Sequence, residues 1–311
     1  MGPICEIVAD NPLVSIIVVC HNHPRYIVSN LDSIRNQTYS HIQLIIINNL
    51  LDECEKIIKD WIAGTDFTGE ITFIQNQKAL GVCPNLNLGL DYVKGDYFQL
   101  ISADDILLPE KIEKQVSRFF QLDQSYAAVY SDMAFIDAEG IIIRKSSFEL
   151  FNDSGQVKAN PIPYLFRGGK VIPSPTLLMK TEIIRKTGGY SNEWPIEDWP
   201  VYFKLAKLGY KFKLIDEVLV QYRVLPDGLG KKHNQETLLF CISLFENNLS
   251  LYNPRDKDQV LKWFSFISQL QRYSVITSVT KFLRFFRHLR NQHIYFLTRY
   301  IIHLVKSIYS H

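Results

Sequence analysis

The chain has 311 residues, of which 47% are hydrophobic and 21% charged. This is the composition of an ordinary soluble globular protein, and the length predicts one large domain with an appendage, or two domains. No run of about 18 apolar residues occurs, so we expect no membrane-spanning helix. The chain does not begin with a basic segment followed by an apolar core, so we expect no secretory signal.

Cysteine usage and charge distribution indicate the compartment. The five cysteines are scattered and include no Cys-x-x-Cys pair, which favours buried thiols in a reducing compartment over disulfides or a zinc site. The net charge is +2, but residues 255–311 contain ten Lys or Arg and only two Asp. That tail carries +8, which leaves −6 for residues 1–254. We therefore expect a cytoplasmic protein whose tail meets an anionic partner, most simply the inner face of a membrane.

Strands and helices alternate about four times in the first 120 residues. Residues 14–20 form a β-branched run typical of a central parallel strand. The alternation predicts an open, mostly parallel α/β sheet with helices on both faces. The predicted strands are 14–20, 43–47, 71–74 and 97–101, and the predicted helices are 26–37, 53–63, 85–93 and 110–120.

The second half of the sequence is less regular. Residues 146–163 are polar and Pro-rich and are predicted to form a loop over the sheet. We place a domain boundary after residue 225, so that 1–225 is the sheet domain and 226–311 a basic, helical region beginning with a flexible joint at 226–230. The other predictions are strands 127–130, 141–144, 176–179, 212–215 and 218–224, a hairpin turn at 137–140, and helices 181–187, 199–208 and 235 onward.

Polar clusters follow three of the predicted parallel strands. They are Cys20-His21-Asn22, Asn48-Asn49 and Asp104-Asp105. Ligands of open α/β sheets bind outside the carboxyl ends of the strands, so these clusters mark the expected site. No Gly-x-Gly-x-x-Gly follows the first strand and no Gly-Lys-Ser/Thr loop occurs, which argues against a dinucleotide dehydrogenase and a P-loop enzyme.

The adjacent carboxylates Asp104 and Asp105 need a physical explanation. Two such groups at the end of a buried strand repel each other and lose hydration unless a cation lies near them. A hard divalent cation is the usual partner, because it binds oxygen ligands and bridges a carboxylate to substrate phosphates. The alternative is a simple helix cap, since Pro109 opens a helix shortly afterwards.

Six motifs in order resemble the family 2 glycosyltransferases of the GT-A fold. The resemblance covers about residues 13–225 and excludes the helical tail. It implies transfer of a sugar from a nucleotide-diphosphate donor to an acceptor hydroxyl, with inversion at the anomeric carbon. The motifs are Val14-Ser-Ile-Ile-Val-Val-Cys-His-Asn22, Ser33-Ile-Arg-Asn-Gln-Thr-Tyr39, Leu44-Ile-Ile-Ile-Asn-Asn49, Ala103-Asp-Asp105 with Leu108-Pro109, Gly188-Gly-Tyr190 and Glu197-Asp-Trp199.

The resemblance implies roles for four carboxylates. Asp105 corresponds to the ligand of a Mg²⁺ or Mn²⁺ ion that bridges the two phosphates, and Asp104 to a residue that holds the ribose and helps the metal. Asp198 corresponds to the base that takes the proton of the acceptor hydroxyl, and Glu197 to a residue that orients the acceptor. Asp198 could also cap the helix that follows it, and the two roles are compatible.

The resemblance also implies a nucleotide site and a third metal ligand. Cys20, His21 and Asn22 correspond to the loop that packs on the base, and Asn49 to a residue that accepts a hydrogen bond from the base. Lys78 is either a phosphate contact or a solvated lysine. His233 corresponds to a histidine that completes the metal shell, although its spacing from Arg223 is longer than the family pattern. Asn48, Asn49 and Ser102 stand where the family commonly has acidic residues.

The tail carries apolar residues at helical spacing between 278 and 309, interspersed with Lys and Arg. Such a helix lies in a membrane interface or packs against the catalytic domain or a second subunit, as in a homodimer. The membrane interpretation suits a lipid-linked acceptor, whereas the other admits any saccharide acceptor. No nucleic-acid recognition motif accompanies the charge, so we expect no nucleic-acid partner.

Two functions of different class remain open. The first is a metal-dependent inverting glycosyltransferase in the assembly of a surface polysaccharide or glycolipid. The second is a catalytically silent relative that serves as a binding or scaffold subunit, suggested by Asn48, Asn49 and Ser102. A nucleotidyltransferase is disfavoured, because the glycine- and lysine-rich loop expected after the first strand is missing.

Overall fold

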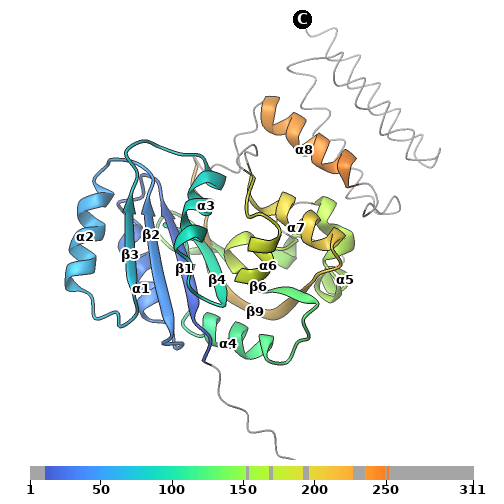
Figure 1. The fold of residues 1–311 in the computed structure, drawn as a ribbon, viewed down its shortest axis with the longest axis horizontal. Helices are drawn as coiled ribbons and strands as arrows, with labels where there is room; N and C mark the ends of the chain where they lie inside the picture. The colour runs from blue at the N-terminus through green and yellow to red at the C-terminus, as the bar shows by residue number, and fades with distance from the viewer. Residues whose placement is uncertain are drawn as a thin grey trace, which may run out of the picture.

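The chain folds around one large sheet. The computed structural model describes residues 11–151, 154–167, 171–191, 196–226, 235–248 and 251. Over these residues a nine-stranded sheet has the order β3-β2-β1-β4-β8-β6-β9-β5, with β7 paired to β6 (Figure 1). The strands are β1 (Val14–Cys20), β2 (Ile42–Asn48), β3 (Ile71–Gln75), β4 (Tyr97–Ser102), β5 (Ile106–Leu107), β6 (Tyr126–Ile136), β7 (Ile142–Arg144), β8 (Leu178–Lys180) and β9 (Lys211–Arg223).

Helices connect these strands. Four of them alternate with the first strands, as the sequence predicts: α1 (Ile27–Arg35), α2 (Cys54–Gly64), α3 (Val82–Tyr92) and α4 (Lys111–Phe119). The later α-helices are α5 (Ser154–Ala159), α6 (Thr181–Lys186), α7 (Asp198–Lys207) and α8 (Gln235–Asn247). Short 3₁₀ helices are η1 (Ser147–Leu150), η2 (Ile162–Arg167) and η3 (Ser174–Thr176). Strands β1 to β4 are mutually parallel, which confirms the predicted α/β sheet.

Hydrophobic cores cover both faces of the sheet. Neighbouring residues of one strand enter different cores: Ile17 joins the core under α3, α6 and α7, and Val18 joins the core under α1, α2 and α4. Because both faces are buried, the strands can be continuously apolar, which explains the β-branched run at residues 14–20. Figure 1 shows helices on both sides of the strands.

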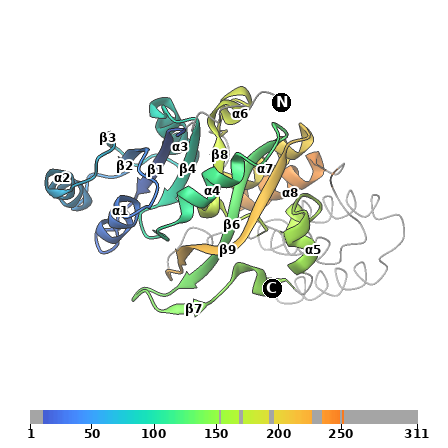
Figure 2. The same cartoon turned by 90° about the horizontal axis from the view of Figure 1, so that it is seen from below.

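The second half departs from the prediction in its strands. The two strands predicted at 212–215 and 218–224 are one strand, β9, which runs parallel to β6 with register shifts beside Asp132. The bulge lets one strand continue past polar residues that sequence reasoning took as a break. Strand β6 extends to Ile136 rather than ending at 130, and the two-residue β5 was not predicted. The hairpin between β6 and β7 is confirmed, with Gly140 at φ +86° and β7 at the margin of the molecule (Figure 2).

The predicted loop at 146–163 is wrong in part. Within it lie η1, α5 and the start of η2. Phe148 and Val157 are almost completely buried and enter the core on the α7 side. These isolated apolar residues show no helical periodicity over so short a stretch, which is why the composition alone indicated a loop.

Helix α8 packs against the hydrophobic core on the α7 side of the sheet. The ring of Phe245 lies 4.9 Å from that of Phe166 and 5.6 Å from that of Trp199, measured between centroids. Most of the predicted tail, including the apolar stripe between 278 and 309, lies outside the described residues. Over the described part of the chain, no helix combines the length and the apolar character needed to cross a bilayer.

Candidate active site

The carboxyl ends of the parallel strands place the polar clusters at one edge of the sheet. Cys20 is aligned with Asn48, and Val19 with Ser102, in the two parallel pairings of β1. Asn48 is in turn aligned with Gln75 at the end of β3. The residues that follow these strands therefore leave the sheet side by side, as the strand-end clusters predict.

The turn that carries Asp104 and Asp105 is held from two sides. Asn30 of α1 is fully buried, and its Nδ2 donates to the carbonyls of Ser102 (3.0 Å) and Asp105 (2.8 Å). From β9, Nε of Arg223 donates to the carbonyl of Asp104 at 2.9 Å. The hydroxyl of Ser102 donates to Oδ1 of Asp104, a bond that an acidic residue at position 102 could not make.

Asp105 is a buried carboxylate beside a second carboxylate. Only 2% of it is exposed, and burial and the charge of Asp104 raise its pKa well above the usual range. The main-chain N–H of Arg223, 2.8 Å from Oδ1, opposes that shift. Two adjacent carboxylates offer hard oxygen ligands, the kind that Mg²⁺ and Mn²⁺ prefer. Within the described residues, no group of three or more His, Cys, Asp or Glu side chains gathers as a metal cage.

Arg223 links three parts of the site. Its guanidinium lies 4.4 Å from the ring centroid of Tyr26, which precedes α1. Nη1 donates to the carbonyls of Asp137 (2.7 Å) and Ala138 (3.2 Å) in the β6–β7 turn. Together with the bond to Asp104, these contacts leave Arg223 only 7% exposed. The side chain therefore fixes the acidic turn against the first helix and the hairpin.

The second carboxylate pair opens helix α7. Glu197 precedes the helix, and Oδ1 of Asp198 accepts a hydrogen bond of 2.7 Å from the main-chain N–H of Trp199. Burial and the neighbouring Glu197 raise the pKa of Asp198 to about 7. Burial also raises the pKa of Glu197, and a hydrogen bond from the side chain of Ser174 lowers it in part. Asp198 therefore lies in the first turn of the helix, where its carboxylate holds a main-chain N–H and has a pKa near neutral.

Phenols and a thiol surround this pair. Burial raises the pKa of Tyr190, Tyr202 and Cys83, and the charges of Glu197 and Asp198 add to the shift in each case. The hydroxyls of Tyr190 and Tyr202 are buried. These neighbours provide little charge of the opposite sign, which is why the carboxylates keep raised pKa values.

A double glycine directs the chain toward the pair. Gly188 and Gly189 both have positive φ, +83° and +68°, at the end of α6, where the sequence predicts a stop. After them, the N–H of Tyr190 donates to Oδ1 of Asn87 at 2.9 Å, and Nδ2 of Asn87 donates to the carbonyl of Tyr190 at 2.6 Å. Helix α3 therefore anchors the segment that leads to α7.

The charges of both carboxylate pairs act on Tyr222. Burial is the main cause that raises its pKa to about 12, and four negative charges add to it. Those charges belong to Asp105, Asp104, Glu197 and Asp198. A phenol can sense both pairs only if both lie close to it, because Coulomb interactions weaken with distance. The acidic turn and the start of α7 thus both lie near Tyr222, although Asp105 and Glu197 are 92 positions apart in the sequence.

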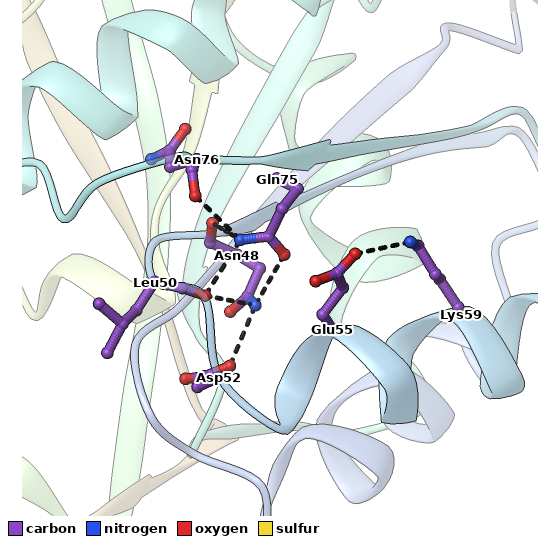
Figure 3. A network of polar contacts seen from close by, with 7 residues as sticks. All are labelled: Asn48, Leu50, Asp52, Glu55, Lys59, Gln75 and Asn76. Carbon is purple, nitrogen blue, oxygen red and sulfur yellow. Dashed lines mark hydrogen bonds and ion pairs between the residues drawn. The ribbon is translucent and has the colours of Figure 1, made fainter.

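The end of β2 carries an amide network. Nδ2 of Asn48 contacts the carbonyl of Leu50 (2.8 Å), Oε1 of Gln75 (3.0 Å) and Oδ1 of Asp52 (3.1 Å), as Figure 3 shows. Asp52 also accepts from the N–H of Cys54 at 3.0 Å. Asn48 therefore holds the loop after β2 to the end of β3.

The residues predicted to pack on the base lie at the same edge. Asn22 has φ +57°, a left-handed conformation that asparagine tolerates, and its N–H donates to Oδ2 of Asp52 at 3.1 Å. His21 is exposed, and its Nδ1 lies 3.3 Å from Nδ2 of Asn49. His21, Asn22 and Asn49 are thus brought together.

The remaining predicted site residues are more dispersed. The Cys20 side chain is fully buried in the core under α1, and burial raises the pKa of its thiol, so only its main chain faces the site loop. Lys78 is exposed on the loop between β3 and α3. His233 lies outside the described residues.

Sequence reasoning missed the residues that support the site. Asn30 and Asp52 act on main-chain atoms of distant loops, and no local pattern reveals such a contact. A polar residue at 30, inside an otherwise apolar helix face with Ile27, Leu31 and Ile34, is the one available signal. Tyr222 could have been suspected only from its place next to Arg223 at a strand end.

Comparison with known proteins agrees with this geometry. The pattern described as Glycosyl transferase family 2 matches residues 15–169. An uncharacterised glycosyltransferase of Methanocaldococcus jannaschii is 28% identical over 218 residues, which cover 69% of this chain and 72% of that protein. The O-antigen biosynthesis glycosyltransferase WbnJ of Escherichia coli is 25% identical, over 75% of this chain and 85% of its own.

A solved structure shows the same fold. The mannosyltransferase PcManGT of Pyrobaculum calidifontis, in complex with GDP-Man and Mn²⁺, superposes with a TM-score of 0.60 at 15% identity. The match covers 96% of this chain and 86% of that one. The chain belongs to glycosyltransferase family 2 and has the GT-A fold.

Proposed function

We propose that this glycosyltransferase moves a sugar from a nucleotide-diphosphate donor to an acceptor hydroxyl with inversion. The observation that carries the proposal is the position of Tyr222 within electrostatic reach of both carboxylate pairs. Inversion needs a base on the face of the sugar opposite the leaving diphosphate. One acidic pair at the sheet edge and another at the start of α7 supply groups for the two faces.

Asp198 is the proposed base. Its pKa of about 7 is suited to proton transfer near neutral pH, because about half of such a base is ionised there and the ionised form is still basic. The hydrogen bond from the N–H of Trp199 fixes one carboxylate oxygen and leaves the other for the acceptor hydroxyl. Glu197 holds the pKa of Asp198 up by its charge, and in our proposal it also orients the acceptor.

Asp105 and Asp104 would hold a Mg²⁺ or Mn²⁺ ion, with His233 as a further ligand. When bound, the ion neutralises the negative charge that grows on the leaving diphosphate. Asn30 and Arg223 hold the acidic turn by its main chain and so keep both carboxylates in place. The buried carboxylate of Asp105, with its raised pKa, supports this assignment.

The biological role follows by analogy. One relative is named as an O-antigen biosynthesis glycosyltransferase, and we propose assembly of a surface polysaccharide or glycolipid for this chain as well. A lipid-linked acceptor at the inner face of a membrane would suit the basic tail, while packing of the tail in a homodimer is the competing proposal. His21, Asn22 and Lys78 are proposed to meet the nucleotide part of the donor.

A silent binding subunit is the second candidate. The specific observation in its favour is that the amides of Asn48 and Asn49 contact this chain's own loops. Calorimetry separates the two functions. Binding of any of UDP, GDP, dTDP, ADP or CDP in the presence of Mn²⁺ supports the transferase, and binding of none favours the scaffold. A donor screen that measures release of nucleoside diphosphate then identifies the sugar and the base.

A further inference from the structure

Asn49 has no hydrogen-bonding capacity left over. Its Oδ1 accepts from the N–H of Leu80 (2.8 Å) and from Nδ2 of Asn76 (3.1 Å). Its Nδ2 donates to the carbonyl of Leu80 (2.9 Å) and lies 3.3 Å from Nδ1 of His21. A side-chain amide offers two acceptor sites and two donors, and all four are in use in a side chain that is only 6% exposed.

These contacts anchor the segment 76–81, which connects β3 to α3. Leu80 is held through both its N–H and its carbonyl, as in a pairing between two peptide groups. Asn76, at the end of β3, donates to Oδ1 of Asn85 at 2.8 Å, and Nδ2 of Asn85 donates to the carbonyl of Gly81 at 2.9 Å. Three asparagines, one directly after β2, one directly after β3 and one on α3, thus fix one loop.

The arrangement requires an amide at position 49. A carboxylate there would keep the two acceptor contacts but has no hydrogen with which to meet the carbonyl of Leu80. Two oxygens would then face each other in a buried position, which is costly. This accounts for asparagine at a position where the resemblance leads one to expect an acid.

We propose that Asn49 is a positioning residue that fixes the loop 76–81 of the donor site and does not read the base. The inference rests on the proposed function, since it concerns how the same site binds its nucleotide. It follows that replacing Asn49 weakens the binding of every nucleotide to the same degree. A base-reading residue would instead discriminate between bases with a ring N–H, as in UDP, dTDP and GDP, and those without one, as in ADP and CDP.

The first test is Asn49→Ala, titrated calorimetrically with these five nucleoside diphosphates in the presence of Mn²⁺. We expect the affinity for each nucleotide that binds to fall by about tenfold, with the ratios between nucleotides unchanged. Steady-state kinetics should show a higher KM for the donor and a kcat close to that of the wild type. A loss confined to the nucleotides with a ring N–H, or to those without one, would overturn the proposal, because an amide can accept from the first group and donate to the second.

Asn49→Asp tests whether a carboxylate at this position strengthens or weakens nucleotide binding. A carboxylate accepts a base N–H at least as well as an amide does, so base reading predicts equal or tighter binding of UDP, dTDP or GDP. Positioning predicts a loss at least as large as that of Asn49→Ala, because the contact with Leu80 becomes repulsive. Retained or increased affinity in Asn49→Asp therefore contradicts the proposal.

Asn76→Ala is the partner variant for a double-mutant cycle, since it removes a contact to Asn49 from the residue that follows β3. If both residues act through the loop, the double variant should lose little more affinity than Asn49→Ala alone. Fully additive losses would contradict a shared loop. Thermal unfolding of each variant identifies any that is not folded at the assay temperature, in which case the remaining single variant carries the test. Failure of the wild type to bind any nucleotide would instead overturn the proposed function.

Discussion

The main-chain N–H of Arg223 donates a hydrogen bond of 2.8 Å to Oδ1 of Asp105. The last residue of β9 thereby holds a carboxylate 118 positions earlier in the chain, at the edge where the parallel strands end. The guanidinium of the same residue binds the carbonyl of Asp104 at 2.9 Å. One residue thus fixes both members of the proposed metal-binding pair.

Replacing Arg223 should weaken metal-dependent donor binding. Arg223→Met keeps the main-chain bond to Asp105 but loses the contacts to Asp104 and the β6–β7 turn, leaving partly buried carbonyls without these donors. We expect about a tenfold loss of nucleotide affinity in the presence of Mn²⁺, measured by calorimetry. Arg25→Met is the matched control, because Arg25 also lies beside Tyr26 but is exposed and paired with Glu139. Equal affinities of the two variants would contradict the role of Arg223.

Asp105 should determine how strongly Mn²⁺ enhances the affinity for nucleotide. Asp105→Asn retains the shape and can still accept the N–H of Arg223, but it has lost the charge that favours a divalent cation. The enhancement of nucleotide affinity by Mn²⁺ should largely disappear, while the weak affinity measured in a chelator should change little. Titration of the wild type and the variant with and without Mn²⁺ measures the effect. An undiminished enhancement would rule out Asp105 as a ligand.

The transfer rate should rise with pH through about 7. Asp198 acts as a base only when it is ionised, and burial together with Glu197 raises its pKa to about 7. Below that pH the carboxylate is protonated and the rate falls tenfold per unit. Glu197→Gln removes a neighbouring negative charge, so the acid limb of the kcat profile should move to lower pH. An acid limb that stays in place in this variant would contradict the coupling of the two carboxyls.

Lys111 should make stability depend on pH. Its amine is fully buried and donates to Oε1 of Gln99 and, at 2.6 Å, to Oε1 of Gln115, and burial lowers its pKa well below the usual range. Between that lowered pKa and about 10.4, the unfolded chain binds more protons than the folded one, so stability rises with pH. Lys111→Met should abolish this increment, although it also leaves the amide oxygens of Gln99 and Gln115 without a donor.

Urea unfolding at neutral pH and at a pH of about 9.5 measures the difference between the two chains. The free energy of unfolding of the wild type should increase relative to that of Lys111→Met as the pH rises. The exposed Lys56 provides a control, since Lys56→Met should change stability by less than about 0.5 kcal/mol at either pH. A constant difference between wild type and Lys111→Met would show that the buried amine does not titrate in this range.

Much of the architecture could be predicted because its signals are local. The β-branched run at 14–20 and the alternation that follows define a parallel sheet, and the carboxyl ends of such strands locate the site. The spacing of Glu197-Asp198 before an amphipathic stretch likewise placed this pair at a helix start. Asp104, Asp105, Glu197 and Asp198, which the sequence singles out, all lie near enough to Tyr222 for their charges to raise its pKa.

What could not be predicted depends on long-range contacts. The sequence shows that residue 49 is an asparagine. It does not show that Leu80 and Asn76 donate hydrogen bonds to the side-chain oxygen of that residue. It shows a break between 215 and 218, but not that a bulge opposite Asp132 keeps β9 continuous. In each case the decisive partner lies many residues away, so no window of neighbouring residues contains the information.

The most direct test of the account is transfer by Asp198→Asn. Asparagine can still accept the N–H of Trp199 and so keeps the helix start, but it cannot take a proton from the acceptor. Release of nucleoside diphosphate should be measured from a panel of UDP-, GDP- and dTDP-sugars with Mn²⁺ and saccharide acceptors, alongside calorimetric binding of the same donors. We predict unchanged donor affinity and a kcat about 10²- to 10⁴-fold lower than that of the wild type. Transfer at the wild-type rate would show that Asp198 is not the base and would contradict the central claim.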